Sequence, residues 1–345
     1  MKHSAPIALL VLSAVVLAGC SATGSAETSA DAEVIQVVAT TSVYGDIANV
    51  VGGDLVEVSS IISSAAQDPH SYEPSSKDKL TVGHADLIVS NGGGYDSFIS
   101  GLISDEAVPV IEAVTFAGDY PGNDDAAEEE HDHAEDANGD EHDHAEEAND
   151  DDRDHSDADD EHAGHNHIAG FNEHVWYDPA VIALVADDIA EHLSEIDTEN
   201  AGTFAANAEK FHTALDGLTG EIAALAATLD HTHILVTEPV ALRLTDLLDM
   251  HNVTPAAFLE AVEDGQDVAP ATLLETLKLL EDDDIALVIA NTQTGGNETE
   301  RVIEEAGDAG IPVLEFAEII PADTTYVDLM SQNVAALAAA LYSRS

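Results

Sequence analysis

The hydrophobic positions of this chain fall into short apolar runs that alternate with stretches of helical spacing. From residue 33 to about residue 111, this alternation favours a parallel sheet, because parallel neighbours are joined by crossing helices. The apolar runs predict strands at Val34–Ala39, Leu55–Ile62, Asp86–Ser90 and Val108–Ile111. The stretches between them predict helices at Asp46–Val51, Ser75–Gly83 and Tyr95–Ile103.

A much longer helix is predicted in the middle of the chain, over Ala201–Leu229. Its apolar residues recur at steps of four and three, which places them on one stripe of the helix surface. The stripe consists of Phe204, Ala208, Phe211, Leu215, Leu218, Ile222, Leu225 and Leu229. A helix of this length runs roughly 43 Å at 1.5 Å per residue, enough to span a domain or to link two.

The alternation resumes after this helix and predicts a second half of the same kind. Strands are predicted at Ile234–Val236, Ile285–Ala290 and Ile311–Phe316. Helices are predicted at Val240–Met250, Pro270–Asp282, Asn297–Asp308 and Thr325–Tyr342. The predicted fold class is therefore α/β, with two sheets of parallel type flanked by helices.

One segment interrupts the first half. Residues 123–167 hold 21 acidic residues, one arginine and eight histidines, with almost nothing apolar. Such a segment buries too little apolar surface to offset its ordering entropy, so we expect a disordered insert. Neutral imidazole is a favoured ligand of Zn²⁺, so the insert is expected to bind metal weakly at several sites. Its histidines are His131, His133, His142, His144, His155, His162, His165 and His167.

The charge balance narrows the possible partners. The 345 residues include 69 Asp and Glu against 9 Lys and Arg, for a formal net charge of −60. Nucleic acid is excluded as a partner, because phosphate backbones are held by Lys and Arg. Binding to an anionic membrane through basic patches is disfavoured for the same reason. A surface this acidic is typical of a protein from a high-salt habitat.

The N-terminus has the features of a targeting segment. Its apolar run, Ile7–Ala18, is shorter than the roughly 20 residues of a membrane-spanning helix and suits a signal peptide. The sequence Leu17-Ala18-Gly19-Cys20 resembles the lipobox of bacterial lipoproteins. That resemblance implies a signal peptide at 1–19, lipid on Cys20, a flexible tether at 20–32 and a location on the outer face of the cytoplasmic membrane. Cys20 is the only cysteine, which excludes internal disulfides.

Two histidines outside the insert lie in loops bounded by proline. His70 belongs to Asp68-Pro69-His70-Ser71-Tyr72-Glu73-Pro74-Ser75, and His174 belongs to Glu173-His174-Val175-Trp176-Tyr177-Asp178-Pro179. The prolines exclude helix in the first segment, and Ser75 and Asp178 are suited to cap the helices that follow. A rigid loop at a strand end, such as that of His70, is where open α/β sheets bind ligands. Either histidine alone fits a surface or capping residue equally well, but two such histidines together with the His-rich insert favour metal ligands.

These two strings resemble the two histidine motifs of the metal-binding solute receptors of zinc and manganese ABC importers, the cluster A-I periplasmic solute-binding family. Zinc members of that family often carry a His-rich acidic loop between the motifs. The resemblance covers the chain from Thr40 to its C-terminal helix. It implies an N-terminal lobe at 33–195 and a C-terminal lobe at 231–345, linked by one long rigid helix at 196–230, with the metal in the cleft between them. It also implies a monomer without enzymatic activity that works with an ABC permease and its ATPase.

The resemblance further implies two ligands in the second half. The third ligand of the family follows the first strand of the second lobe, where Glu238 stands in this chain. The fourth is a carboxylate after a Gly-Ile-Pro-Val strand, where Glu318 stands, with Asp323 as the alternative. The expected metal site is therefore His70, His174, Glu238 and Glu318.

This ligand set leaves the choice of metal open between two classes. Three imidazoles and one carboxylate suit Zn²⁺, whereas two imidazoles and two carboxylates also suit Mn²⁺ or Fe²⁺. The His-rich insert favours zinc, so zinc is the expected cargo and manganese or iron the alternative. An extracellular zinc hydrolase would need an open coordination position for water and a general base, and the sequence contains no motif for that base. A metal-dependent adhesin is the third hypothesis.

Overall fold

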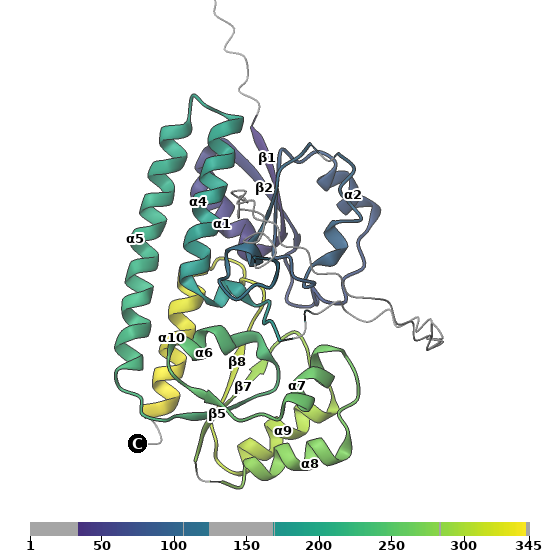
Figure 1. Cartoon of the computed structure of the whole chain (residues 1–345), viewed down its shortest axis with the longest axis vertical. Coiled ribbons are helices and arrows are strands. Elements are labelled where there is room, and N and C mark those ends of the chain that lie inside the picture. Colours follow the sequence, from purple (N-terminus) through teal and green to yellow (C-terminus); the bar gives the residue numbers. More distant parts are fainter. Residues whose placement is uncertain (1–33, 106, 124–167, 169, 283, 343–345) are drawn as a thin grey trace, which may run out of the picture. The chain divides into compact units, whose positions relative to one another are not determined.

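A computed structural model describes residues 34–105, 107–123, 168, 170–282 and 284–342 of the chain (Figure 1). The predicted signal peptide, Cys20, the tether and the eight histidines of the insert lie outside these residues. Within the described residues, no helix combines the length and the apolar character that crossing a membrane requires.

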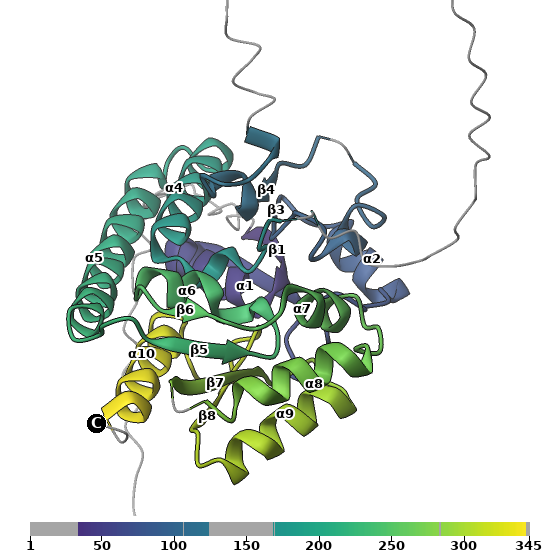
Figure 2. The same cartoon turned by 60° about the horizontal axis from the view of Figure 1, so that its bottom comes forward.

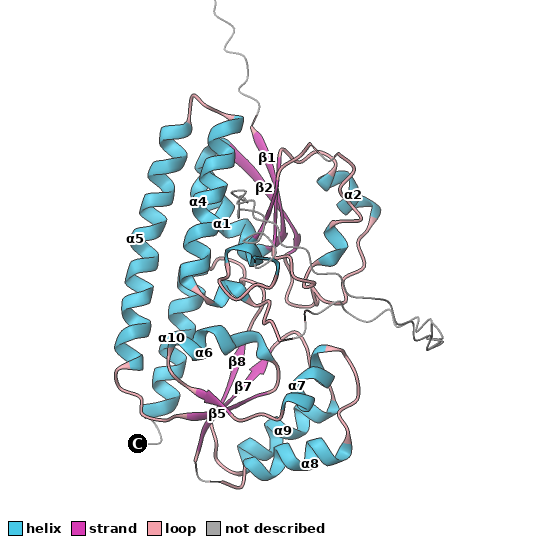
Figure 3. Ribbon diagram, viewed as in Figure 1, coloured by secondary structure: helices cyan, strands magenta, loops and turns pink. Residues whose placement is uncertain are grey.

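The first half of the described chain contains a sheet of four parallel strands in the order β2-β1-β3-β4. Its strands are β1 (Ile35–Thr41), β2 (Val56–Ile62), β3 (Leu87–Ser90) and β4 (Val110–Glu112); Figure 3 shows two of them, β1 and β2, as magenta arrows. Its helices are α1 (Ser42–Gly52), α2 (Ser76–Val82) and α4 (Pro179–Ile196). All four residues of β3 are buried, which is typical of a strand that is covered on both faces.

The helix predicted at Tyr95–Ile103 is wrong, because the structure has only a short 3₁₀ turn there, at Ser97–Ile99. The preceding turn is held by Asp96, whose carboxylate accepts hydrogen bonds from the amides of Asn91 at 2.7 Å and Gly92 at 2.9 Å. Gly92 has a φ of 79°, in the region that favours glycine. Residues 91–96 therefore form a hydrogen-bonded turn instead of the start of a helix. This turn directs the Tyr95 side chain into the interior.

The second half contains another sheet of four parallel strands, in the corresponding order β6-β5-β7-β8. Its strands are β5 (His233–Val236), β6 (His251–Asn252), β7 (Ile285–Asn291) and β8 (Val313–Phe316). Its helices are α6 (Leu242–Leu247), α7 (Ala256–Glu263), α8 (Pro270–Leu279), α9 (Asn297–Asp308) and α10 (Tyr326–Tyr342). The fold class predicted from the sequence is confirmed.

Two details of this half were not predicted. The helix expected over Val240–Met250 is shorter, because Asp249 adopts a φ of 55° and the chain then enters β6. Helix α7 was not expected at all. Figure 2 shows α7, α8 and α9 along one side of the second sheet, where Phe258 of α7 packs with residues of α9 and of the sheet in one apolar cluster.

The long helix α5 occupies Ala201–Ala226 and buries the predicted stripe from Phe204 to Leu225, whereas Leu229 lies beyond the helix and is partly exposed. It ends three residues earlier than expected, because the amides of Thr228 and Leu229 bond to carbonyls three residues back in a tightened last turn. The helix contacts α1 and α4 of the first half and α6 and α10 of the second (Figure 1). Its role as a rigid link between the halves stays a prediction.

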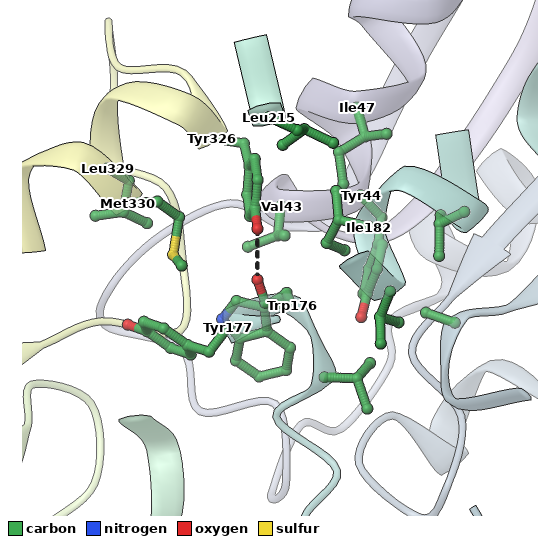
Figure 4. Packing of buried hydrophobic residues seen from close by; sticks show 14 of the residues in the cluster. Val43, Tyr44, Ile47, Trp176, Tyr177, Ile182, Leu215, Tyr326, Leu329 and Met330 are labelled. Carbon is green, nitrogen blue, oxygen red and sulfur yellow. Dashed lines mark hydrogen bonds between the residues drawn. The ribbon is translucent and has the colours of Figure 1, made fainter. Parts of the chain in front are cut away.

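One continuous apolar core joins the two halves. It includes residues of β1 and α1 in the first half together with residues of β7 and α10 in the second. Figure 4 shows Tyr326 of α10 directed at Trp176, whose backbone carbonyl accepts a 2.8 Å hydrogen bond from the tyrosine hydroxyl. A second tyrosine, Tyr177, donates to the carbonyl of Ala317 at 2.7 Å. The metal motif around Trp176 is thus fixed to the second half through buried contacts.

Candidate metal site

The loop that carries His70 is fixed at both ends by acidic side chains. Asp68 accepts hydrogen bonds from the His70 amide at 2.9 Å and from the Ser71 hydroxyl at 2.7 Å. At the far end, Ser75 and Asp78 form a capping box at the start of α2, as the N-cap prediction for Ser75 requires. The proline-bounded segment therefore holds His70 in a defined position at the carboxyl end of β2.

His174 is oriented by a neighbour two residues earlier in the chain. The side-chain oxygen of Asn172 lies 3.0 Å from the His174 amide and 2.8 Å from its Nδ1, and the Asn172 amide nitrogen donates to the Pro239 carbonyl at 3.0 Å. Because that oxygen only accepts, Nδ1 of His174 carries a proton and Nε2 keeps the lone pair. This tautomer would let Nε2 coordinate a metal, an arrangement typical of metal-binding histidines.

Arg243 of α6 holds the same segment from the second half. Its Nε donates to the Asn172 carbonyl at 2.8 Å, and its guanidinium pairs with the Asp119 carboxylate at 3.1 Å. The guanidinium also lies 5.0 Å from the centre of the Phe171 ring. Asn172 is thus held by contacts to the second half on its backbone and on its side chain.

Glu318 follows β8 and is fully buried. The Tyr95 hydroxyl donates to its Oε2 at 2.7 Å, and Nε2 of His70 lies 3.9 Å from the same oxygen. Its own amide donates to the side-chain oxygen of Gln293 at 2.6 Å. Burial raises the pKa of Glu318, while His70 and the hydrogen bonds from Tyr95 and Asn291 act in the opposite direction. A bound cation would favour the ionised carboxylate.

Glu238 follows β5 and is also buried. The amide of Asn291 donates to both Glu238 and Glu318, and the Thr294 hydroxyl donates to the same Glu238 oxygen. Burial, and then the charge of Glu318, raise the pKa of Glu238 well above its ordinary value. The other oxygen of Glu238 has no hydrogen-bond partner among the described residues, which suits a carboxylate that binds a cation.

The structure brings three of the four expected ligands into one group. His70, His174 and Glu318 offer ligand atoms that all lie within 4.8 Å of one another, and the two imidazole centres are 5.8 Å apart. Glu238 is not in this group, although Asn291 ties it to Glu318. Asp323, the alternative to Glu318, is exposed. The assignment of all four as ligands stays a prediction.

Most of these residues follow the carboxyl ends of parallel strands, whereas His174 lies in the segment before α4. His70 comes after β2, Tyr95 after β3, Glu238 after β5 and Glu318 after β8, while Asn291 ends β7. In open parallel sheets this edge is where ligands bind, because the loops there are free to carry polar groups while the strands stay apolar. The two sheets direct these edges toward a common site.

Sequence reasoning missed four residues of the site. Tyr95 was assigned to a helix, and Asn172, Glu173 and Asn291 were given no role. Glu173 is buried, and its Oε1 lies 3.9 Å from Nδ1 of His70. Its direct proximity to His174 in the sequence was the only available signal. The roles of the other three depend on contacts between segments that are far apart along the chain.

Comparison with known proteins identifies the family. The family model of ZnuA, described as zinc-uptake complex component A, periplasmic, matches residues 37–340. The chain belongs to this family. The match spans both sheets and every predicted ligand, so the resemblance stated from the two histidine motifs is confirmed.

Individual relatives agree with this membership. The manganese ABC transporter substrate-binding lipoprotein PsaA of Streptococcus pneumoniae is 39% identical over 92 residues, which are 27% of this chain and 29% of PsaA. The chain thus matches less than a third of that relative's length. Among solved structures, the Mn²⁺ complex of FpvC from Pseudomonas aeruginosa has a TM-score of 0.63 at 19% identity, over 90% of this chain and 99% of that one. TroA, a periplasmic zinc-binding protein of Treponema pallidum, has a TM-score of 0.63 at 15% identity, over 89% of this chain and 99% of that one. At these identities the two structures support the fold alone.

Proposed function

We propose that this chain is the binding component of an ABC-type importer of a divalent transition metal and that it performs no covalent chemistry. In this role it captures the ion outside the cytoplasm and delivers it to a membrane permease driven by an ATPase. The observation that carries the proposal is the convergence of His70, His174 and Glu318, whose ligand atoms lie within 4.8 Å of one another in the interior. The lipid anchor on Cys20, the outer face of the cytoplasmic membrane as location and the monomeric state belong to the same proposal.

Zinc is the proposed cargo, with manganese or iron as the alternative. Two imidazoles with Glu318 and Glu238 would balance the charge of a dication and would accept either class of metal. The eight histidines of the insert favour zinc, because oxygen-preferring Mn²⁺ gains less from imidazole. Named relatives of this family bind zinc or manganese, which is consistent with both choices. Metal analysis of protein purified from cells grown in mixed metals would decide between them.

Titration of single-histidine variants with zinc tests the site. In a variant that lacks residues 124–167, we expect one tight binding event, because the proposed ligands lie outside the insert. Loss of an outer-shell partner typically lowers metal affinity by about 10–100-fold. His70→Ala and His174→Ala each remove a proposed ligand, so each should lower the zinc affinity by more than that. His84→Ala is the control, since His84 is exposed just after α2 and its Nδ1 lies beside the Leu80 carbonyl of that helix, away from the proposed ligands. Near-native affinity in both cleft variants would refute the site.

A further inference from the structure

A cavity of about 420 Å³ adjoins the metal site and opens between the segment before His174 and helix α7. Both halves contribute to its wall. Its described lining carries four carboxylates and no Lys or Arg; the acidic residues are Glu173, Glu260, Glu263 and Asp264. Arg243 beside the cavity is already paired with Asp119. The cavity therefore attracts cations.

Inside this wall, a second group of metal-binding side chains shares one member with the first. Glu173, His174 and Glu263 offer ligand atoms that all lie within 4.8 Å of one another. Glu173 and His174 are buried, and Glu263, the last residue of α7, is partly exposed at the cavity. One imidazole and two carboxylates form a ligand set that suits Zn²⁺, Mn²⁺ or Fe²⁺.

The two groups are neighbours, and they share the His174 imidazole. Asn172 fixes its tautomer, so His174 offers a single lone pair. One ion bound through that lone pair excludes a second ion at the other position. Glu173 lies within 3.9 Å of His70, which belongs to the first group. A cation held by Glu173 and Glu263 therefore needs only to exchange carboxylates around His174 to reach His70 and Glu318.

We propose that Glu173, His174 and Glu263 form a second, transient position for a divalent transition metal, on the path between the cavity and the metal site. This position deepens the proposed function, because it rests on His70, His174 and Glu318 as the place where the ion is held. An ion passes through it both on arrival and on release. Removing a ligand of a transit position slows both steps and leaves the equilibrium affinity unchanged.

The single tryptophan of the chain provides the readout. Trp176 is buried, and its ring centre lies 5.2 Å from that of His174, so its fluorescence reports on this site. Stopped-flow mixing of the full mature chain with Zn²⁺ alone gives the association rate, and mixing with a chelator gives the dissociation rate. We expect Glu263→Gln to lower both rates by about tenfold while the Kd stays within about twofold. Glu260→Gln is the matched control: it removes the same charge from α7 at the same cavity wall, from a residue outside the group, and should change both rates by less than about twofold.

Several outcomes would overturn the proposal. Equal effects of Glu263→Gln and Glu260→Gln would mean attraction by charge alone, and a change in only one of the two rates, with a correspondingly changed Kd, would mean no transit position. A crystal of the His70→Ala variant soaked in Zn²⁺ gives an independent test. Anomalous density between Glu173, His174 and Glu263 would support the position, and its absence there would refute it. If His70→Ala and His174→Ala both leave tight binding intact, the proposed function itself fails; if they abolish tight binding and Glu263→Gln behaves as wild type, only the transit position fails.

Discussion

At the scale of single residues, the site depends on how buried polar groups are paired. Asn172 uses both ends of its side chain, since its oxygen accepts from His174 and its nitrogen donates to Pro239. Asn291 bridges Glu238 and Glu318 differently, because its amide nitrogen donates to both carboxylates. Neither asparagine is a predicted ligand, yet each sets the geometry of residues that are. Such outer-shell partners determine the tautomer and the orientation of the ligands.

We therefore predict that Asn172→Ala lowers zinc affinity by about 10–100-fold, because His174 loses the acceptor that fixes its tautomer. Titration of the purified variant with Zn²⁺ measures this effect. The matched control is Asn207→Ala, which also removes an asparagine side chain that bonds to a backbone carbonyl, that of Val51 at 3.0 Å. An affinity loss of the same size in both variants would show that the effect arises from general destabilisation.

At the scale of elements, helix α6 connects the second half to the loop that carries His174. Arg243 reaches from α6 to the Asn172 carbonyl and to Asp119, and its side chain is only 12% exposed. Helix α7 lies on the other side of the cavity and provides Glu263. These two helices thus border the route to the site. The sequence predicted a longer helix in place of α6 and no element in place of α7.

Arg243→Ala should reduce the free energy of unfolding by about 1–3 kcal/mol, because it leaves the Asn172 carbonyl without its charged donor. Zinc affinity should also fall, since the loop of His174 loses its connection to the second half. Chemical denaturation and zinc titration measure the two effects. Arg301→Ala is the control, because Arg301 of α9 pairs only with exposed Glu304 and Glu305 among the described ion pairs, and such surface pairs contribute about 0–1 kcal/mol. If Arg243→Ala and Arg301→Ala change stability and zinc affinity by the same amounts, the contacts of Arg243 do not stabilise the His174 loop.

At the scale of the whole molecule, the two halves share one apolar core and two parallel sheets whose carboxyl ends meet at the site. The core runs from β1 through α5 to α10, so wide separation of the halves would expose a large apolar surface. We infer that metal release involves small shifts of loops instead, in the segment of Asn172 and around α7. The same arrangement also buries two carboxylates, Glu238 and Glu318.

The metal-free protein should therefore lose stability as the pH rises. Burial raises the folded-state pKa values of Glu238 and Glu318 above the ordinary 4.5, so the folded state binds protons that the unfolded state has released. Stability is then fully present below the ordinary pKa and falls as the pH rises through the raised values, by about 1.4 kcal/mol per pH unit for each proton. Denaturation between about pH 5 and about pH 8, with and without zinc, measures the slope. Zinc should oppose the loss, because a dication stabilises the ionised carboxylates.

Glu238→Gln should flatten this slope in the metal-free protein, because the variant has one buried acid fewer. Glu315→Gln, which changes an exposed glutamate of β8, should leave the slope as it is. A slope of the opposite sign, or one unaffected by Glu238→Gln, would contradict the assignment of the two buried acids.

The sequence by itself determined the α/β class, most of the strands, the stripe of α5 and the loops of His70 and His174. Each of these follows from local spacing: apolar runs, a period near 3.6, and prolines that exclude helix. Only the tertiary structure decided that Glu318 is buried whereas Asp323 is exposed, that Tyr95 turns inward, and that Asn172, Asn291 and Glu173 surround the ligands. Those facts depend on which strand ends meet across two sheets, and local spacing carries no information about contacts between segments more than a hundred residues apart.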